Sequence, residues 1–142
     1  MTDKRDITIF VVDDDESVRF ALKRLMKSVG LKVETFGSAR EFSDSGGARR
    51  TGILVLDVRM PEMTGLELQK QLAASGAEIP VIFISAHEDS RAVELALAAG
   101  AVAFLYKPFD DQDLLAAIYR ALDKTANDGA DKIPFWDLTK LL

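Results

Sequence analysis

The chain of 142 residues contains no cysteine and only one histidine, His87. The absence of cysteine excludes a disulfide framework and every cysteine-ligated zinc site. A single histidine excludes a metal site built from several imidazoles. It also excludes a Ser-His-Asp triad, unless His87 itself serves as the base. The length suits one domain of ordinary size, which needs neither disulfides nor a metal to form a core.

Long hydrophobic runs are absent as well. The most apolar segments, at 9–12, 53–56 and 81–84, hold four residues each, whereas a membrane-spanning helix needs about 20. The first six residues are charged and polar, with no apolar segment behind them that would be typical of a secretory signal. We therefore expect a cytoplasmic protein that does not enter a membrane.

Positive charge is in deficit, because 18 lysines and arginines face 23 aspartates and glutamates, which gives a net charge of −5. This balance argues against nucleic acid as a direct partner. Basic residues on the first predicted helix, among them Arg19 and Lys23, are expected to form a solvated face or to meet an acidic partner.

Two hydrophobic periods alternate along the chain. Short apolar runs predict buried strands, and the segments between them carry apolar residues at helical spacing, often after a capping residue. The predicted strands are 7–12, 31–36, 53–57, 81–84 and 102–106, and the predicted helices are 15–29, 38–43, 64–75, 89–99 and a last one from 110. This order predicts an α/β fold, in which a five-stranded parallel sheet carries helices on both faces.

Polar residues stand where the predicted strands end, and the carboxyl edge of such a sheet is where ligands bind. They are Asp13, Asp14 and Asp15 after the first strand, Asp57 at the third, Ser85 at the fourth and Lys107 at the fifth. Clustered carboxylates form a hard oxygen site for Mg²⁺, lysine can hold phosphoryl oxygens, and an aspartate can act as a nucleophile. The joint placement indicates phosphoryl transfer. Each residue taken alone also has a purely structural explanation. Asp13 or Asp15 could cap a helix, and Ser85 could be a loop hydroxyl. Lys107 and His87 could simply be exposed.

Four segments resemble the motifs of response regulator receiver domains, in order and at matching spacing. They are 11–19 (VVDDDESVR), 57–67 (DVRMPEMTGLE), 79–87 (IPVIFISAH) and 100–109 (GAVAFLYKPF). The resemblance covers about residues 6–124 and is strongest to receivers of LuxR-type helix-turn-helix regulators. It implies a flavodoxin-like (βα)5 fold with strand order 2-1-3-4-5. It also implies a receiver domain over 1–124, followed by a linker and an apolar tail over 125–142.

The resemblance implies a role for each matching residue. Asp57 would accept a phosphoryl group from a histidine kinase or a histidine phosphotransfer protein. Mg²⁺ would be bound by Asp14, Asp57 and the backbone carbonyl of Arg59, with Asp13 acting through water. Lys107 would bind the phosphoryl oxygens. Such a protein is not an enzyme in the usual sense, because it catalyses only its own phosphorylation and slow dephosphorylation.

The same resemblance implies a conformational switch. Ser85 would bind a phosphoryl oxygen, Phe104 would turn inward, and the surface of the fourth helix, fifth strand and fifth helix would change. The bond before Pro108 would be cis. Ser85 replaces the more frequent threonine, so its coupling to Phe104 is expected to be looser.

Arg59 and His87 occupy positions that flank the path of hydrolytic water in the resembled family. Both are bulky, which predicts a long-lived phosphorylated state; the alternative for His87 is an exposed loop residue. The face of the first predicted helix around Arg19 and Lys23 is a candidate kinase-binding surface.

Three alternatives remain beside a stand-alone receiver. The chain could be the receiver part of a DNA-binding transcriptional regulator. An aspartate-nucleophile phosphohydrolase is disfavoured, because Arg59 stands where such enzymes carry their acid. A nucleotide-binding domain is disfavoured, because no glycine-rich phosphate loop follows the first strand.

The last predicted segment, 125–142, begins with a polar linker and ends in IPFWDLTKLL. Its density of large apolar residues predicts docking on the receiver, on a partner or on a second copy; the alternatives are the start of an output domain and a disordered end. A homodimer through this tail or through the fourth helix, fifth strand and fifth helix is a further expectation.

Overall fold

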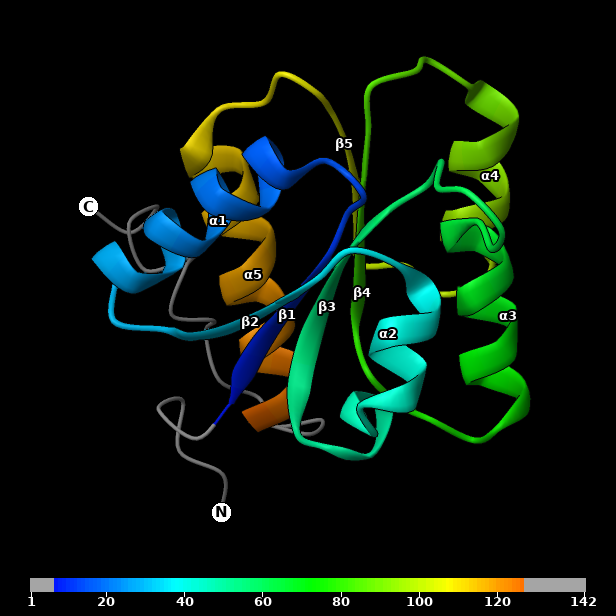
Figure 1. Ribbon diagram of the computed structural model, residues 1–142, viewed down its shortest axis with the longest axis horizontal. Coiled ribbons are helices and arrows are strands. Elements are labelled where there is room, and N and C mark those ends of the chain that lie inside the picture. Colours follow the sequence, from blue (N-terminus) through cyan, green and yellow to red (C-terminus); the bar gives the residue numbers. More distant parts are fainter. Residues whose placement is uncertain (1–6, 127–142) are drawn as a thin grey trace.

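A computed structural model describes residues 7–126 and shows a five-stranded parallel sheet (Figure 1). The strand order is β2-β1-β3-β4-β5, which confirms the predicted α/β fold and topology. The strands are β1 (Thr8–Val12), β2 (Lys32–Phe36), β3 (Gly52–Asp57), β4 (Val81–Ser85) and β5 (Ala103–Tyr106). All neighbouring strands run parallel, so their carboxyl ends meet at one edge of the sheet.

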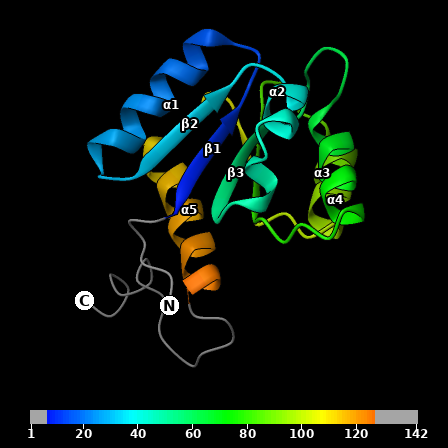
Figure 2. The ribbon, with the colours of Figure 1, turned by 60° about the horizontal axis from the view of Figure 1, so that its bottom comes forward.

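Helices cover both faces of this sheet. They are α1 (Glu16–Ser28), α2 (Ala39–Asp44), α3 (Gly65–Ala74), α4 (Ser90–Ala98) and α5 (Asp111–Ala126). The helices α1 and α5 lie on one face, whereas α2, α3 and α4 lie on the other (Figures 1 and 2). A short 3-10 helix, η2 (Gly47–Arg49), stands where the sequence predicted only a loop, because three residues carry no detectable periodicity.

The strands β1, β3 and β4 are buried along their full length. Successive side chains alternate between two hydrophobic clusters, because a strand points its residues to opposite faces. In β1, Ile9 and Val11 pack under α1 and α5, whereas Phe10 and Val12 pack under α2, α3 and α4. Two cores therefore hold the centre of the sheet rigid, and the loops at its carboxyl edge start from fixed points.

Side-chain caps fix where the first four helices begin. At α2, the Ser38 hydroxyl accepts a hydrogen bond from the Glu41 amide. The Asp15 side chain accepts a hydrogen bond from the Ser17 amide at the start of α1. Thr64 and Glu67 form the predicted capping box of α3. Asp89 caps α4. These caps satisfy amides that have no partner within the helix, and each lies on a loop at the carboxyl edge.

The predicted tail lies outside the described residues, apart from residues 125 and 126, which end α5. Over the described range 7–126, no helix has the length and apolar character that would let it cross a membrane.

Candidate functional site: an acidic pocket at the carboxyl edge of the sheet

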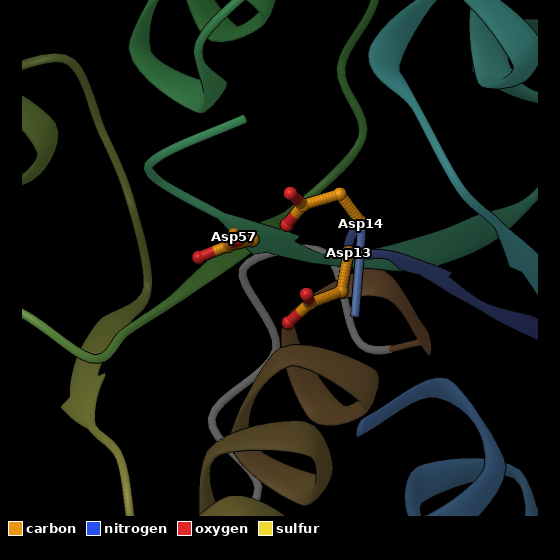
Figure 3. Close-up of side chains that lie close together, drawn as sticks. All are labelled: Asp13, Asp14 and Asp57. Atoms are coloured by element: carbon orange, nitrogen blue, oxygen red, sulfur yellow. The ribbon is translucent and has the colours of Figure 1, made fainter. Parts of the chain in front are cut away.

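Three carboxylates meet where β1 and β3 end (Figure 3). Asp13 and Asp14 follow the last residue of β1, and Asp57 is the last residue of β3. Each offers a carboxylate oxygen within 4.8 Å of the others. Asp13 and Asp57 are buried, whereas Asp14 is exposed. The pocket thus has a buried floor and one side that faces solvent.

Lys107 brings a positive charge into this cluster from the end of β5. Its Nζ lies 2.7 Å from Asp13 Oδ2 and 3.6 Å from Asp57 Oδ1. The Lys107 amide donates to the Ser85 carbonyl at 2.7 Å, and the Lys107–Pro108 peptide bond is cis. The ammonium therefore sits between the two buried carboxylates.

Within the pocket, the carboxyl group of Asp57 has a clearly shifted pKa. The pKa of its carboxyl is raised to about 7, chiefly by burial and then by the negative charges of Asp13 and Asp14, while the positive charge of Lys107 partly opposes the rise. Asp14 also shares a hydrogen bond with the protonated form of Asp57. Surplus negative charge in a desolvated site is relieved by a proton or by a bound cation.

Asp13 is held by backbone and side-chain contacts that the sequence did not indicate. Its Oδ1 accepts a hydrogen bond from the Asp15 amide at 2.9 Å, and its carbonyl accepts one from Arg19 Nη1 at 2.7 Å. Arg19 therefore faces its own chain rather than solvent alone. The signal for it would have been an arginine one turn into the helix that follows the aspartates.

Ser85 lies at the end of β4 and is buried, but its hydroxyl points to its own loop. Ser85 Oγ donates to the His87 carbonyl at 3.2 Å and accepts from the His87 amide at 3.1 Å. The structure thus brings Asp13, Asp14, Asp57 and Lys107 together, and leaves the Ser85 hydroxyl in a turn beside them.

The remaining candidate residues lie around the pocket. Phe104 in β5 is half-buried, and its ring stacks on the buried Phe83 at 5.9 Å between centroids. Arg59 and His87 are exposed. Arg59 Nη2 lies 3.8 Å from Asp89 Oδ2, so this side chain leans toward the start of α4.

Gly65 is a site residue that sequence reasoning assigned only to a helix start. A Cβ at this position would collide with the Asp57 carbonyl oxygen, and the Gly65 amide donates to the Val58 carbonyl at 2.9 Å. The first turn of α3 therefore packs directly against the backbone of Asp57. Only a glycine permits this approach.

The donor set fits a hard divalent cation. Mg²⁺ is bound by few protein carboxylates and keeps room for water and phosphoryl oxygens. Asp13, Asp14 and Asp57 supply such oxygens, with no competing nitrogen or sulfur ligand among them. Burial and the neighbouring carboxylates both raise the pKa of Asp57, and a bound cation would favour its charged form.

Comparisons with known proteins agree with this geometry. The family model described as response regulator receiver domain matches residues 9–119. The chain is 48% identical over 122 residues to the response regulator protein TmoT of Ectopseudomonas mendocina, which covers 86% of this chain and 55% of that protein. It is 42% identical over 123 residues to the transcriptional regulatory protein FixJ of Azorhizobium caulinodans, covering 87% and 58%. The chain thus spans little more than half the length of these relatives.

Solved structures give the same result. The response regulator StyR matches with a TM-score of 0.81 and 48% identity, over 87% of this chain and 62% of that one. The structure called FixJ-N matches with a TM-score of 0.75 and 35% identity, over 94% of this chain and 100% of that one. A flavodoxin-like sheet, a carboxylate cluster with its lysine and these matches lead to one conclusion: the chain belongs to the response regulator receiver domain family.

Proposed function

We propose that Asp57 accepts a phosphoryl group from a histidine kinase or a histidine phosphotransfer protein and that the chain relays the resulting change to a partner. The observation that carries this proposal is the cluster of Asp13, Asp14 and Asp57 at the carboxyl edge of the sheet, with the Lys107 ammonium beside Asp13 and Asp57. In the transfer, the donor's nitrogen–phosphorus bond breaks, and a bond forms between an Asp57 carboxylate oxygen and phosphorus. The donor imidazole leaves with the electron pair.

Each pocket residue has a task in this reaction. Asp57 attacks as the carboxylate, so its proton must leave first. Lys107, 3.6 Å from Asp57 Oδ1, would neutralise charge on the phosphoryl oxygens. Asp14, Asp57, the Arg59 carbonyl and, through water, Asp13 would hold Mg²⁺. When bound, the ion would supply positive charge to the transferring group.

Ser85 and Phe104 are proposed to carry the signal away from Asp57. Ser85 would exchange its hydrogen bonds with the His87 backbone for one to a phosphoryl oxygen. Phe104 would then shift from its stacked position on Phe83 and turn further inward. The surface of α4, β5 and α5 would change in response, which is a local charge event acting on a two-state element.

Arg59 and His87 are proposed to lengthen the life of the phosphorylated state. Both are exposed side chains on the loops that follow β3 and β4, where their bulk would hinder water. Loss of phosphate should therefore be faster in the double variant Arg59→Ala, His87→Ala than in the wild type. Slower or equal loss in that variant would contradict this role.

The partners and the output are proposed from the chain's relatives. Several are called transcriptional regulatory proteins, and the chain matches about half of most of them, so an output domain that binds DNA is the main alternative to a stand-alone receiver. The receiver itself would not bind nucleic acid. On α4 and β5, three large apolar side chains are exposed and could meet a protein partner or a second copy: Leu95, Leu97 and Tyr106. On α1, Lys23 is an exposed candidate for kinase contact. A cytoplasmic location follows from a kinase partner.

The deciding experiment is intact mass spectrometry after incubation with Mg²⁺ and a small acyl phosphate. Wild type should gain one phosphoryl group, and Asp57→Asn should gain none. Asp15→Asn is the matched control, because this neighbouring acid caps α1 and asparagine caps equally well. It should be phosphorylated like the wild type. Uptake by Asp57→Asn, or no uptake by folded wild type, would overturn the proposal.

A further inference from the structure

The cap of α4 is connected to the loop that carries Arg59. Asp89 Oδ1 accepts hydrogen bonds from the amides of Arg91 and Ala92, both at 3.1 Å. The other oxygen, Oδ2, lies 3.8 Å from Arg59 Nη2. One carboxylate therefore fixes the first turn of α4 and also holds the arginine two positions beyond Asp57.

The two loops joined by this ion pair start side by side. Asp57 pairs with Ile84 in the sheet, and the Val58 amide donates to the Ile84 carbonyl at 3.1 Å. Arg59 and Asp89 thus bridge the loops that follow β3 and β4, next to the acidic pocket. The Arg59 side chain is 58% exposed, so solvent rather than packing surrounds it and it can reorient.

The far end of α4 is fastened in a different way. The buried side chain of Gln69 in α3 donates from Nε2 to the Ala96 carbonyl at 3.1 Å. A buried neutral hydrogen bond is costly to break, because its groups would be left without partners. The helix is therefore anchored firmly near its carboxyl end, and at its amino end by an exposed ion pair that salt and competing anions can weaken.

We infer that Asp89 is a positioning residue that holds Arg59 beside the acidic pocket, and that phosphorylation of Asp57 draws Arg59 away and loosens the first turn of α4. The inference rests on the proposed phosphorylation of Asp57. A phosphoryl group adds nearly two negative charges and three acceptor oxygens. Arginine binds such oxygens more strongly than it binds one carboxylate oxygen at 3.8 Å. Gln69 keeps the other end of α4 in place, so the motion is confined to the turn nearest Asp57.

The test separates the two tasks of Asp89 by substitution. Asp89→Asn keeps a capping oxygen, because asparagine caps as well as aspartate, but it removes the charge that holds Arg59. Arg59→Gln removes the other partner. Asp110→Asn is the matched control: Asp110 accepts a hydrogen bond from the Gln112 amide at the start of α5, and no ion pair with Arg59 involves it.

The readout is amide hydrogen exchange along α4, with the phosphorylated fraction measured by intact mass on the same samples. In the wild type, phosphorylation should speed exchange at Arg91–Val93 while the amides that follow Ala96 stay protected. Unphosphorylated Asp89→Asn and Arg59→Gln should already exchange roughly two- to fivefold faster in that turn, the factor that an exposed ion pair supplies. The double variant should be no faster than either single one. At about 1 M salt the difference from wild type should vanish, because charges are screened beyond about 3 Å.

The inference is overturned if amides in the first turn of α4 exchange at the same rate in unphosphorylated Asp89→Asn and in unphosphorylated wild type. It is also overturned if phosphorylation speeds this exchange by the same factor in Asp89→Asn as in the wild type. It is also overturned if Asp110→Asn produces the same change in α4. Failure of the proposed function looks different, because wild type then shows no added phosphoryl group by mass. In that case Asp57 carries no phosphoryl group that could attract Arg59, so the inference is overturned together with the proposed function.

Discussion

The two ends of the sheet differ in how their charged side chains are arranged. Near the amino ends of the strands, Arg50 lies 2.6 Å from Glu34 and 5.2 Å from the centre of the Phe10 ring. At the carboxyl ends, three carboxylates lie close together, one lysine contacts two of them, and the pKa of Asp57 is raised to about 7. At the amino ends, the charges of Arg50 and Glu34 neutralise each other in a partly exposed ion pair. At the carboxyl ends, the carboxylates carry a surplus of negative charge that a bound cation would offset.

This difference shows that the fold places its electrostatic strain where the chemistry is proposed to occur. Apart from Thr8 at the start of β1, the buried strands beneath the pocket have no polar side chain until they reach Asp13 and Asp57. Their hydrophobic packing supplies the stability that allows surplus negative charge at the edge. Perturbed carboxyl groups gather at functional sites for this reason.

The largest expected effect concerns the pH dependence of stability at the strained end. The pKa of Asp57 is raised to about 7 in the folded chain and is about 3.9 when unfolded. Between these values the folded state holds a proton that the unfolded state has lost, so stability falls as pH rises from 4 to 7. The loss attributable to Asp57 is on the order of 2–4 kcal/mol without metal. Denaturant unfolding in EDTA should show it in wild type and not in Asp57→Asn.

Addition of Mg²⁺ at pH 7.5 should restore stability to wild type and much less to Asp57→Asn. If both proteins followed the same pH profile in EDTA, then the pocket would carry no excess charge at Asp57. The contrast between the two ends of the sheet would then be lost.

The next effect in size concerns the lysine of the pocket. Lys107→Met removes the positive charge between Asp13 and Asp57, and phosphorylation by a small acyl phosphate should slow by about 100-fold, a typical cost of losing one charge-stabilising donor. Lys32→Met on β2 is the control, because Lys32 is exposed at the opposite end of the sheet. Time courses of intact mass measure both rates. If Lys107→Met were phosphorylated at a rate within a factor of about two of the wild-type rate, the change in activation free energy would be small. Lys107 would then have no substantial role in the reaction.

A smaller effect tests the packing beneath Asp57. Gly65→Ala would push a methyl group into the Asp57 carbonyl oxygen, and overpacking costs about 1–3 kcal/mol. Gly37→Ala lies at the same edge, but its Cβ would meet nothing nearer than 3.4 Å. Thermal unfolding should separate the two variants. Phosphorylation should also slow in Gly65→Ala alone, because Asp57 is displaced. Equal stability of both variants would show that α3 can move away from the strand.

Gly65 also marks the limit of what the sequence could predict. The strands, the caps at Asp15, Thr64 and Asp89, and the edge that collects Asp13, Asp57 and Lys107 follow from local periodicity and one rule about parallel sheets. The contact between Gly65 and Asp57 depends on how closely a helix approaches a strand end. The capping-box pattern signalled only that α3 begins there.

Other site features depend on distances between segments in the same way. The ion pair between Arg59 and Asp89 joins positions that no spacing rule connects. The hydrogen bond from Arg19 to the Asp13 carbonyl depends on the angle at which α1 leaves the end of β1. The direction of the Ser85 hydroxyl depends on the turn that His87 forms. The role assigned to Phe104 came from family resemblance alone, whereas Ser85 was also indicated by its place at the end of a predicted strand.

The smallest expected effect belongs to the balanced end of the sheet. Arg50→Ala removes a partly exposed ion pair with Glu34 and a cation–π contact with Phe10, which together contribute about 1 kcal/mol. Urea unfolding should show that loss. Glu34→Ala should cost less, because Arg50 keeps its contact with the ring. Neither variant should alter phosphorylation of Asp57, since both lie away from the carboxyl edge. A change in phosphorylation rate with unchanged stability would mean that the two ends of the sheet are coupled, and the separation between a stabilising end and a reactive end would fail.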